Sequence, residues 1–119
     1  MWHGMATSEI DRSEWQRAMG LLLEKRRPPA HIRQELDLEC RIKGASVEVV
    51  EIRPQWDSRS QKIEHPVAKA TYVKSKRHWR VFWLRRDLKW HRYDPAPEVA
   101  TLQAFARLVA EDKHACFFG

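Results

Sequence analysis

Residues 36–53, LDLECRIKGASVEVVEIR, are the part of the sequence that decides the fold. From Leu36 to Ile42, apolar side chains alternate with charged ones, which is the period of a half-buried β-strand. Gly44 interrupts this run where a tight turn requires a left-handed backbone angle. A second run rich in β-branched residues follows the glycine. The sequence therefore predicts a β-hairpin with strands at 36–43 and 46–53.

The second strand of this hairpin changes phase along its length. Val47 and Val49 share one face, whereas Val50 and Ile52 share the other. A regular strand that is buried on one side keeps a single apolar face. The change in phase therefore predicts either a β-bulge near Val50 or a strand that is covered on both sides.

Three more strands are predicted after this hairpin. Pro54 is expected to end the second strand and to open a polar loop at 54–65. Further apolar runs separated by turn residues predict strands at about 67–74, 79–85 and 88–93. Arg86 and Asp87 are the expected turn between the last two strands.

Helical patterns flank the strands. At 8–27, Trp15, Ala18, Met19 and Leu22 form an apolar stripe at helical spacing. Ser8 and Ser13 are alternative N-caps, and Ser13 with Gln16 forms a capping-box pattern. Pro28 ends this helix.

Two shorter helical segments complete the prediction. Pro29 is expected to open a short second helix that reaches Glu35. A last helix is predicted at 97–112, with an apolar stripe that includes Phe105 and Val109. The apolar Phe117 and Phe118 are expected to dock the C-terminal tail.

The predicted architecture is a single α+β domain over residues 1–119. It consists of an N-terminal helix and a short second helix, an antiparallel meander sheet of about five strands, and a C-terminal helix. Residues 1–12 are expected to form a flexible N-terminal extension.

The basic charge of the chain is concentrated in the middle. The formal net charge is +6, and residues 74–92 carry eight lysines and arginines against one acid, Asp87. A polyanion partner is favoured by such a concentration. The sequence shows neither a signal peptide nor an apolar run long enough for a membrane span, and two cysteines are too few for a disulfide scaffold. A cytoplasmic location without membrane contact is expected.

The aromatic residues among these bases support two interpretations. Trp79, Phe82 and Trp83 are expected in the core, because tryptophan and phenylalanine dominate sheet packing, whereas the placement of Trp90 stays open. The alternative is a stacking platform with nearby cations, as in proteins that bind single-stranded nucleic acid. The candidate residues for a nucleic-acid or polyanion surface are Arg85, Lys89, His91, Tyr93, Arg80 and Lys69.

Two other functions remain open from the sequence. A metal-dependent phosphodiesterase would use Asp87 and Lys89 with either Glu48 or Glu51, since two carboxylates hold a cation and a lysine offsets charge at the phosphate. Alternatively, the basic face would bind an acidic protein. The histidines lack the paired spacing of a zinc site, and no nucleophile motif or glycine-rich phosphate loop is present. The sequence therefore assigns no catalytic residue, metal or cofactor.

Three motifs carry a resemblance to a known family: EIRPQW at 51–56, PVAKATYVKS at 66–75 and WRVFWLRRDLKWHRYDP at 79–95. With them, the chain resembles a family of small bacterial proteins known as domain of unknown function 3024. The resemblance covers about residues 15–119 and is most specific at RRDLKWH, 85–91. It implies a bacterial cytoplasmic protein, and it implies no activity, cofactor or catalytic residue.

Overall fold

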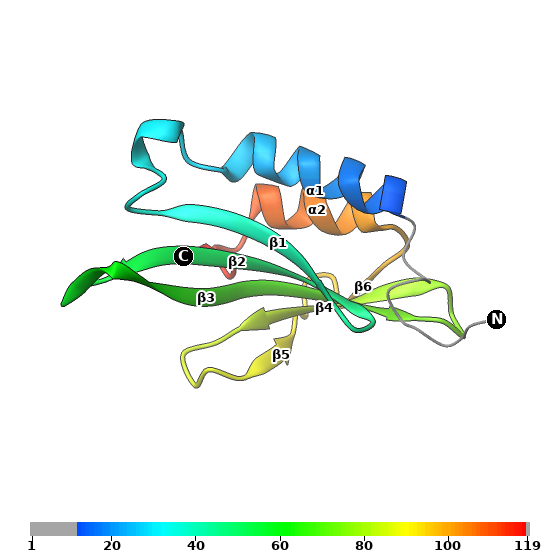
Figure 1. The fold of residues 1–119 in the computed structure, drawn as a ribbon. Helices are drawn as coiled ribbons and strands as arrows, with labels where there is room; N and C mark the ends of the chain where they lie inside the picture. Colours follow the sequence, from blue (N-terminus) through cyan, green and yellow to red (C-terminus); the bar gives the residue numbers. More distant parts are fainter. Residues whose placement is uncertain (1–11, 119) are drawn as a thin grey trace.

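The computed structural model describes residues 12–118, apart from the side chains of residues 58 and 59. Within this range a six-stranded antiparallel sheet is covered on one face by two helices, which lie side by side in Figure 1. In chain order the elements are α1 (Arg12–Arg26), the 3-10 helix η2 (Ala30–Ile32), β1 (Asp37–Lys43), β2 (Ser46–Gln55), β3 (Ser58–Val73), β4 (His78–Leu84), β5 (Trp90–Arg92), β6 (Glu98–Val99) and α2 (Leu102–Glu111). The predicted α+β class and the antiparallel sheet are confirmed.

The sheet is a meander in which neighbours in sequence are neighbours in space. The order is β1-β2-β3-β4-β5, and β6 pairs with the start of β4 beside β5. The predicted first hairpin is confirmed, with Lys43 opposite Ser46 and Gly44 at a φ of 62°. This positive φ is the conformation that glycine adopts at little cost.

The β2–β3 pairing is irregular at the point where β2 changes phase, but the bulge lies on β3 and not on β2, whose register against β1 is continuous. The register against β3 shifts between Val49, which pairs with Ala68, and Val50, which pairs with Pro66. Val67 is therefore the additional residue on β3. Val49 and Val50 are both buried and, as consecutive residues of a strand, lie on opposite faces, so β2 is covered on both sides at this point, which was the other predicted alternative.

The predicted polar loop at 54–65 is wrong, because these residues extend β2 and begin β3. Their pairing ends in a tight turn at Trp56 and Asp57. Pro54 pairs with Lys62, beyond the last residue of β2 that β1 contacts, which is Ile52. A proline is tolerated there because its missing N–H faces no neighbouring strand.

Three other predicted boundaries also need correction. The second helix is only the three-residue turn η2, and the last strand is only Trp90–Arg92. The last helix begins at Leu102 and not at 97, because residues 98–99 form β6. The N–H of Val81 donates to the carbonyl of Pro97 at 2.9 Å, which keeps this segment on the sheet edge. The extension predicted at 1–12 lies outside the described residues except for Arg12, the first residue of α1.

The core lies between the sheet and the two helices. Ala18, Met19 and Leu22 of α1 are buried as the helical stripe predicts, and α2 buries the four apolar residues Leu102, Phe105, Ala106 and Val109. Thr101 caps α2, because its hydroxyl accepts the N–H of Ala104 at 3.0 Å. This layer leaves the opposite face of the sheet without a helix in the described chain, and that face is called the open face below.

The C-terminal tail docks as predicted. The carboxylate of Asp112, which follows α2 at a φ of 45°, accepts the N–H groups of Phe117 and Phe118 at 3.0 Å each. Phe117 is buried, and its ring centroid lies 4.7 Å from that of Tyr93. None of the helices in residues 12–118 is both long and apolar enough to cross a membrane.

Candidate functional site

A row of five side chains crosses the open face from one edge of the sheet to the other. The register places Arg41, Glu48, Lys69, Phe82 and Arg92 opposite one another on β1 to β5. Directly paired residues of antiparallel strands lie on the same face. The end of the row on β3, β4 and β5 therefore has an aromatic ring between a lysine and an arginine.

Lys69 contacts the aromatic residues of this face. Its Nζ lies 5.0 Å from the ring centroid of Phe82 and 4.9 Å from that of Trp90. At these distances the cation is attracted to the negative faces of both rings. Partial burial lowers the pKa of Lys69, and the nearby Glu48 carboxylate opposes this effect. The Lys69 ammonium group therefore contacts both rings and places a cation beside them.

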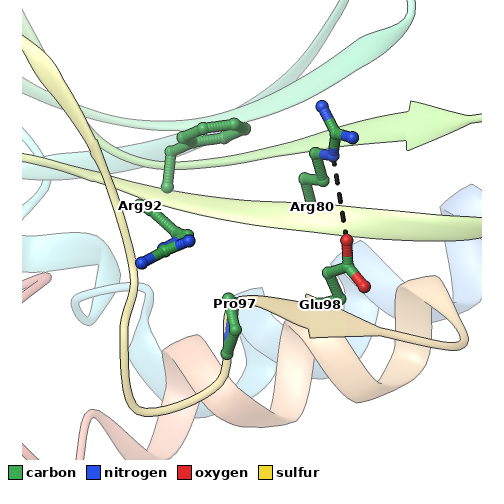
Figure 2. Close-up of a pocket in the computed structure, with 5 residues that line it drawn as sticks. Arg80, Arg92, Pro97 and Glu98 are labelled. Atoms are coloured by element: carbon green, nitrogen blue, oxygen red, sulfur yellow. Dashed lines mark ion pairs between the residues drawn. The ribbon is translucent and has the colours of Figure 1, made fainter.

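A hollow of about 410 Å³ opens beside Phe82 on the same face. Figure 2 shows Arg80 and Arg92 on either side of this hollow, with Pro97 and Glu98 along its rim. The side chains of Arg80 and Arg92 are 52% and 72% exposed, so both guanidinium groups are accessible to a ligand. A flat ring beside two guanidinium groups suits a ligand that combines planar rings with phosphate groups.

Glu98 is the counter-ion at the rim of the hollow. Its carboxylate lies 3.8 Å from Lys76 Nζ and 3.8 Å from Arg80 Nε. His78 Nε2 lies 3.1 Å from the same carboxylate, but the angle is not that of a hydrogen bond. One acid therefore faces three basic groups at the start of β4, and it forms no hydrogen bond with Arg80 at this distance.

The opposite face of the β4–β5 hairpin carries a second aromatic and basic group. The guanidinium carbon of Arg85 lies 5.3 Å from the ring centroid of Trp83, and His91 pairs with Trp83 in the register. His91 Nε2 and Asp87 Oδ2 form a hydrogen bond of 2.8 Å. This bond, together with the N–H that Lys89 donates to the same carboxylate, lowers the pKa of Asp87.

Comparison with protein families matches residues 7–119 to Domain of unknown function (DUF3024), which is nearly the whole chain. The chain belongs to this family. The resemblance seen in the sequence motifs is thereby confirmed. No curated protein and no solved structure matches the chain.

The six residues predicted for one surface do not share one face. Lys69 and Arg80 lie on the open face, whereas Arg85 and His91 lie with Trp83 on the other side of the β4–β5 hairpin. Lys89 belongs to the turn between the two strands.

The prediction that Tyr93 lies on the binding surface is wrong, because only 1% of this residue is exposed. It packs against Phe117, and burial raises the pKa of its hydroxyl. Tyr93 does have the same strand parity as His91, but the helices and the tail cover that face at its position.

Sequence reasoning missed the central residues of the hollow, Phe82 and Arg92. The strand alternation that places Lys69 and Arg80 together also places these two on the same face, once the pairing of β3, β4 and β5 is known. Of the aromatics expected in the core, Trp79 is buried and Trp83 is partly buried against the core. Phe82 is half-buried and lines the hollow.

The carboxylates proposed for a metal-dependent site are far apart in this DUF3024 chain. Glu48 is on β2 and is in line with Phe82 on β4, which is two strands away, or about 10 Å between backbones. Asp87 follows the end of β4, in the β4–β5 turn, and is therefore further from Glu48 than Phe82 is. Glu51 pairs with Arg53 at 3.2 Å. Among residues 12–118, no three His, Cys, Asp or Glu side chains lie close enough to hold a metal ion together. The geometry therefore gives the phosphodiesterase hypothesis no support.

Proposed function

We propose that the chain binds nucleic acid through the open face of β3, β4 and β5. The residues that carry the proposal are Lys69, Arg80, Phe82, Trp90 and Arg92, which are called the aromatic–arginine patch below. The observation that favours it most is the position of Phe82, which lines the same hollow as Arg80 and Arg92. A nucleobase stacks on such a ring while the arginines contact its phosphates.

The charge distribution agrees with this proposal. Residues 74–92 carry eight bases and one acid, a balance of +7, and they include all of β4 and β5. Phosphate contacts supply most of the affinity in nonspecific nucleic-acid binding. An acidic protein would also be attracted by this charge, but it has no nucleobase to place on Phe82. The aromatic ring therefore favours nucleic acid over an acidic protein.

The test is the affinity of a fluorescently labelled 12-nucleotide single strand of mixed sequence, measured by anisotropy at low salt. In Phe82→Leu the apolar volume is largely kept but the aromatic face is lost. Stacking of one base contributes about 1–3 kcal/mol, so we expect binding at least about 5-fold weaker. Phe118→Leu is the matched control, because Phe118 also has a cation over its ring, Arg26 at 4.8 Å, but lies in the docked tail.

Three results would contradict the proposal. The first is absence of binding to the oligonucleotide even at low salt. The second is an equal loss of affinity in Phe82→Leu and Phe118→Leu, because the ring of Phe82 would then have no special role. The third is competition by polyglutamate as efficient as that by unlabelled oligonucleotide, which would favour an acidic protein partner.

A further inference from the structure

Three hollows follow one another around the β4–β5 hairpin. The first is the hollow of the open face, and the second, of about 380 Å³, shares Arg92 with it. The third, of about 460 Å³, shares Trp83 and Arg85 with the second and adds Arg86 and Asp87. Neighbouring hollows share lining residues, and the three together are called the hairpin groove below.

The hairpin groove passes from one face of the sheet to the other. Phe82 and Trp83 are consecutive residues of β4, so their rings lie on opposite faces. Arg92 is on β5, which pairs only with β4 in the described chain and therefore presents its other edge outward. With 72% of its side chain exposed, Arg92 borders the hollows on both sides of this edge.

Each face offers the same pair of chemical groups. On the open face Phe82 lies near Arg80 and Arg92, and on the other face Trp83 lies 5.3 Å from the guanidinium carbon of Arg85. The acids along the groove already have basic neighbours: Asp94 lies 3.0 Å from Arg92 Nε, and Asp87 lies 2.8 Å from His91 Nε2. The groove thus alternates rings and guanidinium groups in the way that a strand of nucleic acid alternates bases and phosphates.

We propose that a single strand of nucleic acid follows the hairpin groove around the edge of β5 and stacks bases on both faces. This inference rests on the proposed function and names the form of nucleic acid that it would take. Duplex DNA has a persistence length of about 150 base pairs, so bending it around the edge of one sheet costs free energy that a flexible single strand avoids. Its bases are also paired and stacked on each other, and the two rings on opposite faces cannot reach them without unstacking.

The experiment compares ligands and variants by fluorescence anisotropy at 0.1 M salt. The ligands are a labelled 12-nucleotide single strand, a labelled 3-nucleotide strand and the 12-base-pair duplex of the same sequence. The variants are Arg85→Ala/Arg86→Ala, which removes two cations from the far part of the groove, and Arg17→Ala/Arg107→Ala, which removes the same charge from exposed positions on the helices.

We expect the 12-nucleotide strand to bind more tightly than both other ligands. Two phosphate contacts on a single strand strengthen binding about 25-fold when the salt concentration falls from 1 M to 0.1 M. A variant that lacks both contacts loses this gain at 0.1 M salt. Arg85→Ala/Arg86→Ala should therefore bind the 12-nucleotide strand about 25-fold more weakly and should bind the 3-nucleotide strand as the wild type does. The control variant should resemble the wild type with both ligands.

The outcomes separate this inference from the proposed function. If the duplex binds as tightly as the single strand, or if Arg85→Ala/Arg86→Ala behaves like the control with the 12-nucleotide strand, the path around the edge is refuted while the patch on the open face is retained. If none of the three ligands binds, the proposed function fails and the inference fails with it.

Discussion

The response of binding to salt is the most direct measure of how many cations contact the ligand. The hairpin groove and Lys69 together place five basic side chains along the proposed path: Lys69, Arg80, Arg85, Arg86 and Arg92. For single strands the logarithm of the binding constant falls with the logarithm of salt concentration by about 0.7 per phosphate contact. Five contacts therefore predict a slope of about −3.5, which is about a 130-fold loss of affinity between 50 and 200 mM salt.

Removing two of these cations should change the slope by a predictable amount. In Arg80→Ala/Arg92→Ala three contacts remain, so the slope should be about −2.1 and the loss over the same salt range about 20-fold. Both arginines are more than half exposed and lie on the rim of the hollow, so we expect little effect of their removal on folding.

The assay is a set of anisotropy titrations with the 12-nucleotide strand at salt concentrations from 50 to 200 mM. Arg17→Ala/Arg107→Ala has the same net charge as the groove variant, and its slope should stay at the wild-type value. If the two variants have the same slope, binding depends on net charge alone and not on the groove. A wild-type slope near zero would refute the phosphate contacts altogether.

Two further predictions concern the folded protein itself. Arg27 binds the Asp37 carboxylate with two hydrogen bonds of 2.9 and 3.1 Å and lowers its pKa. Asp37 therefore contributes stability above its unfolded pKa, near 3.9, and loses it as the pH falls through the lower folded value. Urea melts should show Asp37→Asn less stable by at most about 1 kcal/mol at pH 7, and the difference should shrink as the pH falls below about 3.9; a difference that does not change with pH would contradict this. Burial raises the pKa of Cys40 to about 12 from 9.0, which lowers the thiolate fraction of Cys40 at pH 8 about a thousand-fold. Iodoacetamide should therefore modify the less deeply buried Cys116 first in the native protein. Equal rates of modification by mass spectrometry would show that Cys40 is accessible.

The alternation of side chains was enough to predict the sheet but not its full extent. Leu38, Cys40 and Ile42 gave the correct period for β1, and the two valine phases of β2 marked the position at which the β2–β3 register shifts, although the additional residue lies on β3. The hairpin between β2 and β3 was missed because Pro54 and many polar residues resemble a loop. Both Pro54 and Pro66 lie where a neighbouring strand has already ended, and only the pairing of three strands reveals this.

The candidate site was predicted only in part for a related reason. Alternation shows that His91 and Tyr93 share a face, but it does not show which face the helices cover. Which face is covered depends on the packing of α1, α2 and the tail. This packing places Phe117 against Tyr93 and leaves His91 outside the core. Lys69 and Phe82 come together through the register of β3 and β4, which their own sequence segments do not specify.

The pairing of α1 with α2 has a consequence for how the chain folds during synthesis. The two helices pack against each other over one face of the sheet, although the whole meander separates them in sequence. On the ribosome, Ala18, Met19 and Leu22 of α1 therefore stay without part of their cover until residues 102–111 have emerged. A nascent chain that stalls before this point exposes an apolar helix face to chaperones and to other nascent chains. Emergence of α2 therefore sets when the apolar face of α1 is covered.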